Sequence, residues 1–71
     1  MNILIELASL YSRRPGADAS NDVVAAWYRA KGRLHELIAE GGGPEAPLER
    51  AYAAASYEHA RRLELNPARL K

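Results

Sequence analysis

Apolar positions recur at helical spacing along one long stretch of the chain, residues 21–40. They follow one another at intervals of four, three, four and three residues, which places them on one face of an α-helix. The positions are Val23, Trp27, Ala30, Leu34 and Leu37. Charged side chains gather on the opposite side of this stretch. The pattern predicts a helix over residues 21–40 whose apolar stripe faces a partner helix.

Two further segments carry a similar periodicity. Residues 3–14 have apolar side chains on one helical face, and residues 47–65 form a second stripe at helical spacing. That second stripe consists of Leu48, Tyr52, Ala55, His59 and Leu63. A short strand at residues 2–7 is an alternative for the first segment, but no other strand-like run is available to pair with it. We therefore expect three helices, at about 3–14, 21–40 and 47–65.

Breakers separate these segments. Pro15-Gly16 ends the first helix, because proline disfavours helical geometry in the preceding residue and glycine accepts turn geometry. The run Gly41–Pro47 ends the second helix, and Asn66-Pro67 ends the third. The residues suited to cap the start of the second helix are Asp18, Ser20 and Asn21.

Short connections make sequential helices antiparallel. The prediction is an all-α single domain over residues 1–71: a small three-helix bundle built on a long antiparallel helical hairpin, with the first helix covering the groove between the other two. Equal rise per residue places Trp27 and Tyr28 near His59. It also places His35 near Tyr52.

Gly32 stands in the middle of the second helix, opposite the apolar stripe. A glycine there costs up to about 1 kcal/mol relative to alanine. We interpret it as the site of a mild bend, with close approach of another backbone as the alternative.

The composition excludes several classes of protein. A chain of 71 residues lies near the lower size limit for a single core, and without cysteine it has no disulfide to support that core. Ten basic and nine acidic residues give a net charge of +1, far from the basic excess of proteins held by phosphate neutralisation. The sequence lacks a membrane span and a signal peptide, so we expect a cytoplasmic protein with no membrane partner.

No residue pattern indicates catalysis, a cofactor or a small-molecule substrate. Neither His35-Glu36 nor Glu58-His59 is a chelating pair, because adjacent helical residues point about 100° apart. No metal site is expected within one chain, and coordination across a dimer is the one form that stays open. We expect His59 to be packed and bonded to a tyrosine hydroxyl or to Trp27, and His35 to lie on a partly exposed flank.

Nucleic-acid binding is the second hypothesis. Basic residues on the second and third helices are its candidate contacts, although glutamates lie within one turn of most of them. These candidate contacts are Arg29, Lys31, Arg33, Arg61 and Arg62.

Protein docking is the favoured hypothesis. Tryptophan and four tyrosines are difficult to bury in so small a core, and these residue types carry much of the binding energy of interfaces. We expect Ile5, Tyr28 and Tyr57 to contact a protein partner or a second copy, the alternative being that Ile5 and Tyr57 are merely exposed. The arginine, alanine and glycine-proline usage resembles that of proteins from high-GC bacteria or their phages, and the small size resembles that of accessory and virion proteins of phages and mobile elements. The expected function is that of an adaptor, inhibitor or assembly subunit.

Overall fold

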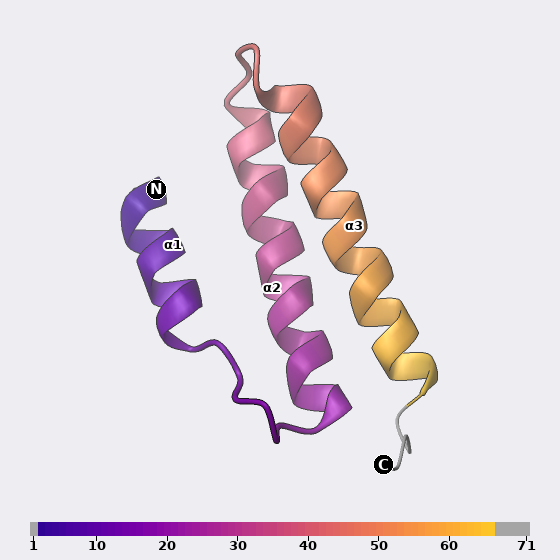
Figure 1. Ribbon diagram of the computed structural model, residues 1–71. Coiled ribbons are helices and arrows are strands. Elements are labelled where there is room, and N and C mark those ends of the chain that lie inside the picture. Colours follow the sequence, from indigo (N-terminus) through magenta and orange to yellow (C-terminus); the bar gives the residue numbers. More distant parts are fainter. Residues whose placement is uncertain (1, 67–71) are drawn as a thin grey trace.

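The computed structural model describes residues 2–66, which contain three α-helices (Figure 1). Helix α1 spans Ile3–Ser12, α2 spans Asn21–Glu40 and α3 spans Ala46–Leu65. No strand forms within residues 2–66, so the all-α prediction with its helical hairpin is confirmed. Helix α1 ends two residues earlier than the sequence pattern predicts, and α3 begins one residue earlier.

The ends of α2 show why the chain turns where it does. Ser20 caps the start of α2, where its Oγ accepts a hydrogen bond from the backbone N–H of Val23 at 3.2 Å. Beyond the C-terminal end, Gly42 and Gly43 have φ angles of +79° and +88°. Residues with a Cβ are strained in this region, so the glycines permit the tight reversal into α3. Pro67, the predicted stop after α3, lies outside the described residues.

Helices α2 and α3 pack along a seam of small residues. On each helix these residues recur at every seventh position, which returns to nearly the same face after two turns. The seam consists of Ala25, Gly32 and Ala39 on α2 and Ala46, Ala53 and Ala60 on α3. All six are buried, and none has a side chain larger than a methyl group. Small residues at a helix contact allow the two axes to approach closely.

The predicted apolar stripe of α2 does not form this seam. Its central residues instead face α1, where Trp27 and Leu34 form a core with Leu10. The indole Nε1–H of Trp27 donates a hydrogen bond of 2.8 Å to the backbone oxygen of Leu10. The ends of the stripe, Val23 and Leu37, are 53% and 40% exposed. The large side chains of α2 thus hold α1, while its small residues hold α3.

Helix α1 lies beside α2 on the side away from α3 (Figure 1). It packs against α2 and makes no contact with α3 within the described residues. The prediction that the first helix covers the groove between the other two is therefore wrong. The reason is the geometry of α2, whose large apolar stripe and small-residue seam occupy opposite sides of the helix.

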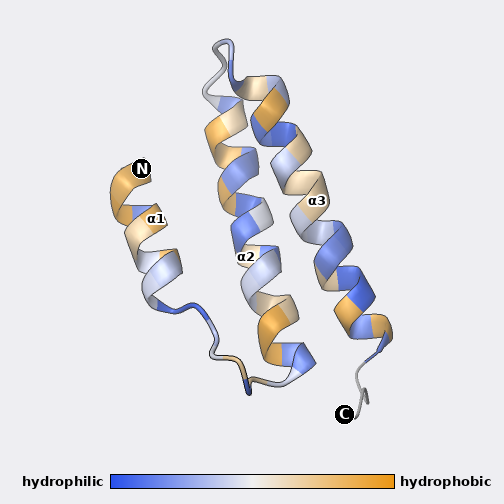
Figure 2. Ribbon diagram, in the orientation of Figure 1, coloured by the Kyte–Doolittle hydropathy of each residue, from blue (hydrophilic) through white to orange (hydrophobic). Residues whose placement is uncertain are grey.

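The three helices consequently form a single layer. Its Cα atoms extend over 42 × 22 × 13 Å, and the middle dimension fits three helices side by side, with axes about 8–10 Å apart. Within residues 2–66 no large side chain is less than 2% exposed. Figure 2 shows apolar residues distributed along all three helices. The layer therefore has two broad faces, and neither is covered by another element of the described chain.

Candidate docking face

One broad face of the layer carries a row of aromatic rings that crosses all three helices. The ring of Tyr11 on α1 lies 5.4 Å from that of Trp27 on α2, in an edge-to-face arrangement. Trp27 lies 5.2 Å from Tyr28, and Tyr28 lies 4.2 Å from His59 on α3. The distances are those of favourable aromatic pairs. The row thus connects α1, α2 and α3 on one side of the layer.

A second ring pair lies on the same side of the seam. His35 and Tyr52 are 5.3 Å apart, and each is seven residues from its counterpart in the pair Tyr28–His59. Both pairs match the register predicted for the hairpin. Two leucines extend this surface, because Leu48 precedes Tyr52 by one turn and Leu4 precedes Tyr11 by two. We define the aromatic face as Leu4, Tyr11, Tyr28, Leu48, Tyr52 and His59.

Much of the aromatic face is exposed to solvent. The exposed fractions are 78% for Leu4, 45% for Tyr11, 45% for Leu48 and 44% for Tyr52. The sequence pattern places Leu48 and Tyr52 on the apolar stripe of the third helix, but this stripe does not face α2 because the alanines of the seam occupy that contact. Large apolar side chains exposed on the same face as a row of aromatic rings are typical of an interaction surface.

The charges on the aromatic face compensate one another. His35 Nδ1 donates a hydrogen bond of 2.6 Å to Glu49 Oε1, since a carboxylate only accepts. The Lys31 ammonium lies 3.3 Å from His35 Nε2, which accepts from it in the neutral ring. His35 is partly buried, as predicted. The chain from Lys31 to Glu49 therefore adds no uncompensated charge to this face.

A hollow adjoins the aromatic face where the α1–α2 linker crosses α2. Its volume is about 430 Å³, and it is lined by Trp27 and Tyr28 together with linker residues 14–17. The guanidinium carbon of Arg14 lies 6.0 Å from the centre of the Trp27 ring, at the limit of a cation–π contact. The hollow offers aromatic walls to a side chain that approaches this face.

The opposite face of the hairpin is charged. Arg29 Nε donates to Glu64 Oε2 at 2.8 Å, and a second bond joins the guanidinium to Oε1. The Tyr57 hydroxyl donates to Glu36 Oε1 at 2.8 Å. We define the charged face as Arg29, Arg33, Glu36, Tyr57 and Glu64. Its polar groups largely bind one another across the seam.

Tyr57 is not a free aromatic side chain on this face. Its ring covers Gly32, where an added Cβ would lie 3.0 Å from the Cε1 and Cζ atoms of the ring. Gly32 is itself buried, and the group that approaches it closely is a side chain of α3 rather than the backbone of the alternative; the mild bend stays a prediction. Tyr57 is therefore partly buried against α2 rather than merely exposed, and whether it also contacts a partner stays a prediction.

A double-mutant cycle tests the contact between Gly32 and Tyr57. Gly32→Ala gains helix propensity, about 1 kcal/mol, but it displaces the Tyr57 ring and its bond to Glu36. We expect the change in the free energy of unfolding caused by Gly32→Ala to be more favourable, by about 1 kcal/mol, in the Tyr57→Ala variant than in the unmodified chain. Urea denaturation of the four proteins provides the comparison. If Gly32→Ala changes the free energy of unfolding equally with and without Tyr57, the contact between Gly32 and the Tyr57 ring would be contradicted.

The ion pairs shift the titration of two glutamates. Hydrogen bonds from Arg29 hold the pKa of Glu64 below its ordinary value of 4.5. Hydrogen bonds from Arg61 and Arg62 lower the pKa of Glu58 in the same way. On the charged face, burial raises the pKa of Tyr57, and its bond to Glu36 adds to this shift.

Acid is therefore expected to weaken the fold. A carboxyl group whose pKa is lowered in the folded state contributes stability above its unfolded pKa, and this contribution disappears as the pH falls through the folded pKa. The melting temperature of the unmodified chain should fall between about pH 5 and pH 3. The melting temperature of the Glu64→Gln variant should fall less steeply over the same range. About 1 M salt should reduce the difference, because these groups are exposed and screened. Identical slopes for both proteins at low salt would refute this role of Glu64.

The remaining candidate contacts lie in several places. Ile5 is 63% exposed, one position beyond Leu4 on α1, and Tyr28 is half-buried within the aromatic row. Arg61 and Arg62 both bind Glu58, at 2.7 Å and 3.1 Å.

The basic residues of α2 lie on different faces of the hairpin. Lys31 bonds to His35 beside the aromatic face, whereas Arg29 lies on the charged face with Glu64. Arg33 follows Arg29 by one turn. The structure thus brings Arg29 and Arg33 together on the charged face and places Lys31 beside the aromatic face instead.

His59 differs from its prediction. Its side chain is exposed, although its ring packs against that of Tyr28, and the Trp27 N–H, one of its two expected partners, donates to Leu10 instead. Within residues 2–66 no group of three or more metal-ligating side chains is placed to hold an ion. None of the helices there combines the length and the hydrophobicity needed to cross a bilayer.

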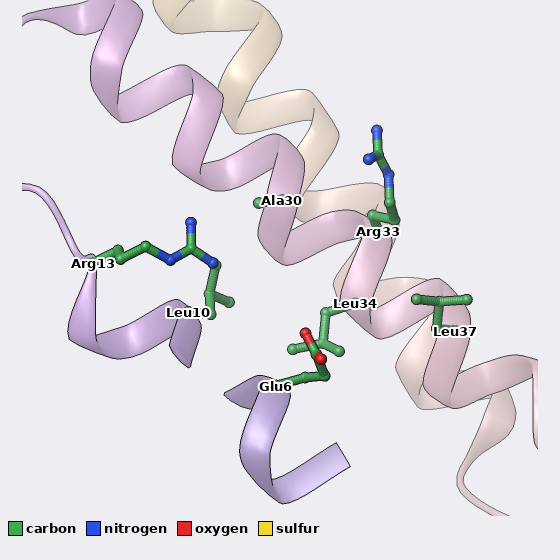
Figure 3. Close-up of a pocket in the computed structure, with 7 residues that line it drawn as sticks. All are labelled: Glu6, Leu10, Arg13, Ala30, Arg33, Leu34 and Leu37. Carbon is green, nitrogen blue, oxygen red and sulfur yellow. The ribbon is translucent and has the colours of Figure 1, made fainter. Parts of the chain in front are cut away.

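A groove between α1 and α2 lies apart from the aromatic face (Figure 3). Its volume of about 180 Å³ is below the roughly 300–1,000 Å³ of typical small-molecule sites. Leu10 and Leu34 line it together with Arg13, just beyond the end of α1, and Arg33 of α2. Glu6 lies at the same groove, so the groove is neither wholly apolar nor of one charge.

The spacing of small residues in the sequence would have located the aromatic face, because it identifies the seam that the face flanks. The small residues at seven-residue spacing, on both helices of the hairpin, mark the seam more reliably than the large apolar residues do. Once the seam is assigned to these residues, Tyr52 and Leu48 fall on its flank rather than at its centre.

Comparison of the chain with protein-family models, with curated proteins and with solved structures found no significant match.

Proposed function

We propose that this chain is a small, non-enzymatic protein-docking module that acts through its aromatic face. The observation that carries the proposal is the row of rings across all three helices, flanked by the exposed side chains of Leu48 and Tyr52. Tyrosine and tryptophan are the side chains that most often dominate binding energy at interfaces. An adaptor, an inhibitor or an assembly subunit would use such a face.

The proposal includes no cofactor and no small-molecule substrate. Catalysis requires polar groups that converge on a pocket. The polar side chains considered above instead bind one another in pairs, such as Arg29 with Glu64 and Tyr57 with Glu36. The proposal places the protein in the cytoplasm, where its partner would meet it.

Affinity capture with matched variants tests the proposal. The face variant carries Leu48→Gln and Tyr52→Gln, which remove two exposed apolar side chains from the aromatic face. The control variant carries Leu37→Gln and Leu65→Gln, whose leucines are 40% and 69% exposed and lie outside that face. Tagged proteins are used to capture partners from cell lysate, with and without nuclease, after circular dichroism has shown equal helicity.

We expect the unmodified chain and the control variant to retain the same protein, which is a second copy or another chain, and the face variant to lose it. Nuclease should have no effect. Retention by all three proteins would place the interface elsewhere. Capture that disappears with nuclease would instead support the nucleic-acid hypothesis, with Arg29, Arg33 and Arg61 as the residues to mutate.

A further inference from the structure

We infer that the occupant of the aromatic face is a second copy of this chain, which packs face to face to form a symmetric dimer. This inference rests on the proposed docking function and names its partner. Three properties of the layer support it: its area, its missing second layer and its balanced charge.

The area of the face matches that of a stable dimer. The Cα extents of 42 × 22 Å bound the broad face of the layer to at most roughly 900 Å². Standard interfaces bury about 800 Å² on each partner. A second layer of the same size would therefore cover the whole face, whereas a short peptide would leave much of it exposed.

Residues 2–66 form one layer and lack the second layer on which a helical core depends. Domains are normally built from two packed layers around one core. The accessible surface of 5075 Å² exceeds the roughly 4,400 Å² expected for a compact chain of this size. The residues with the least exposure are small, Ala60 at 0% and Ala25 at 1%. Another copy supplies a layer of matching length without any other component.

The charge of the face favours self-association. In a two-fold symmetric dimer the same patch meets itself, so a patch with charges of one sign would repel its copy. On the aromatic face Lys31, His35 and Glu49 form one hydrogen-bonded chain with charges of both signs. Arg14, the other cation near it, lies at the Trp27 ring. This mixture of charges does not complement a strongly acidic or a strongly basic partner.

The repeat along the seam supplies the symmetry. The pairs Tyr28–His59 and His35–Tyr52 stand two helical turns apart on the same flank. A two-fold axis that crosses the seam between them places the rings of one pair over the rings of the other pair in the second copy. Leu48 and Tyr52 are then covered in both chains.

Sedimentation equilibrium tests the inference directly. Interfaces of this size have dissociation constants from micromolar to picomolar, so about 100 µM protein is sufficient to populate a dimer. We expect the unmodified chain and the control variant (Leu37→Gln, Leu65→Gln) to show twice the chain mass. The dissociation constant of the face variant (Leu48→Gln, Tyr52→Gln) should be about 100-fold higher, because each substitution occurs twice in the interface.

A chain that is monomeric at this concentration would overturn the inference. Equal weakening by the face and control variants would overturn it as well. A monomer that still captures a different protein, and loses it in the face variant, would leave the docking function intact while removing the second copy as its occupant. If the chain is monomeric and captures no protein, both the inference and the proposed function fail.

Discussion

Ala53→Leu is expected to lower the free energy of unfolding by about 1–3 kcal/mol, which is a large share of the stability of so small a domain. Ala53 is 3% exposed at the centre of the seam, on the part of α3 that faces Gly32. Three added heavy atoms have no space there, so α2 and α3 must separate or adopt strained side-chain conformations. Chemical denaturation followed by circular dichroism measures the loss.

The neighbouring residue provides a matched control for the seam. Ala54 is exposed on the same helix, so Ala54→Leu adds the same atoms without entering the seam. Alanine and leucine have similar helix propensities, and we expect a change within about 0.5 kcal/mol. Comparable destabilisation by Ala53→Leu and Ala54→Leu would show that the close contact of the two helices does not hold the hairpin together.

Trp27→Ala is expected to lower the free energy of unfolding by about 3–5 kcal/mol. This loss is enough to unfold much of the population or to release α1 from α2. Trp27 is 7% exposed, packs with Leu10 and Leu34, and donates the hydrogen bond that joins α2 to the end of α1. Because α1 contacts no helix other than α2, it has no second attachment within the described residues. Amide hydrogen exchange should show faster exchange in α1 than in the α2–α3 hairpin.

Trp27→Phe distinguishes packing from hydrogen bonding at this residue. Phenylalanine keeps a large ring in the core but removes the N–H that Leu10 accepts. We expect a smaller cost, about 1–3 kcal/mol, because the carbonyl of Leu10 still accepts from the backbone of Arg13 at 3.1 Å. If Trp27→Phe and Trp27→Ala destabilise equally, ring packing would contribute little to the attachment of α1.

The hairpin could be predicted from local signals. Proline and glycine ended the helices, a serine capped α2, and the glycine run turned the chain, because these residues act through their own backbone geometry. The register also followed, since it depends only on a constant rise per residue, and it placed His35 beside Tyr52.

The arrangement of faces could not be predicted from large apolar residues alone. Hydrophobic periodicity ranks side chains by size and polarity, so it placed Tyr52 and Leu48 on the stripe of the third helix and gave no weight to Ala53 or Ala60. Close helix packing depends on the opposite property, the absence of a side chain. The position of α1 then changed too, because the stripe at Trp27 was free to hold it.

The candidate site could be predicted only in part. Tyr28 lies in the aromatic row, but Tyr57 packs inside the hairpin against Gly32, a contact that requires the relative rotation of two helices to be known. Helical periodicity within one segment contains no information about that rotation. Whether Ile5 and Tyr28 contact a partner stays a prediction.

Hydroxyl-radical footprinting tests most directly whether the aromatic face is the docking surface. The rates of oxidation at Tyr11, Leu48 and Tyr52 are compared between the dilute chain and the assembled or partner-bound chain, with Leu37 and Leu65 as internal references. Selective protection of the first three residues is the predicted result. Protection of Leu37 and Leu65 in their place, or no protection of any residue in the assembled protein, would contradict the aromatic face as the site of docking.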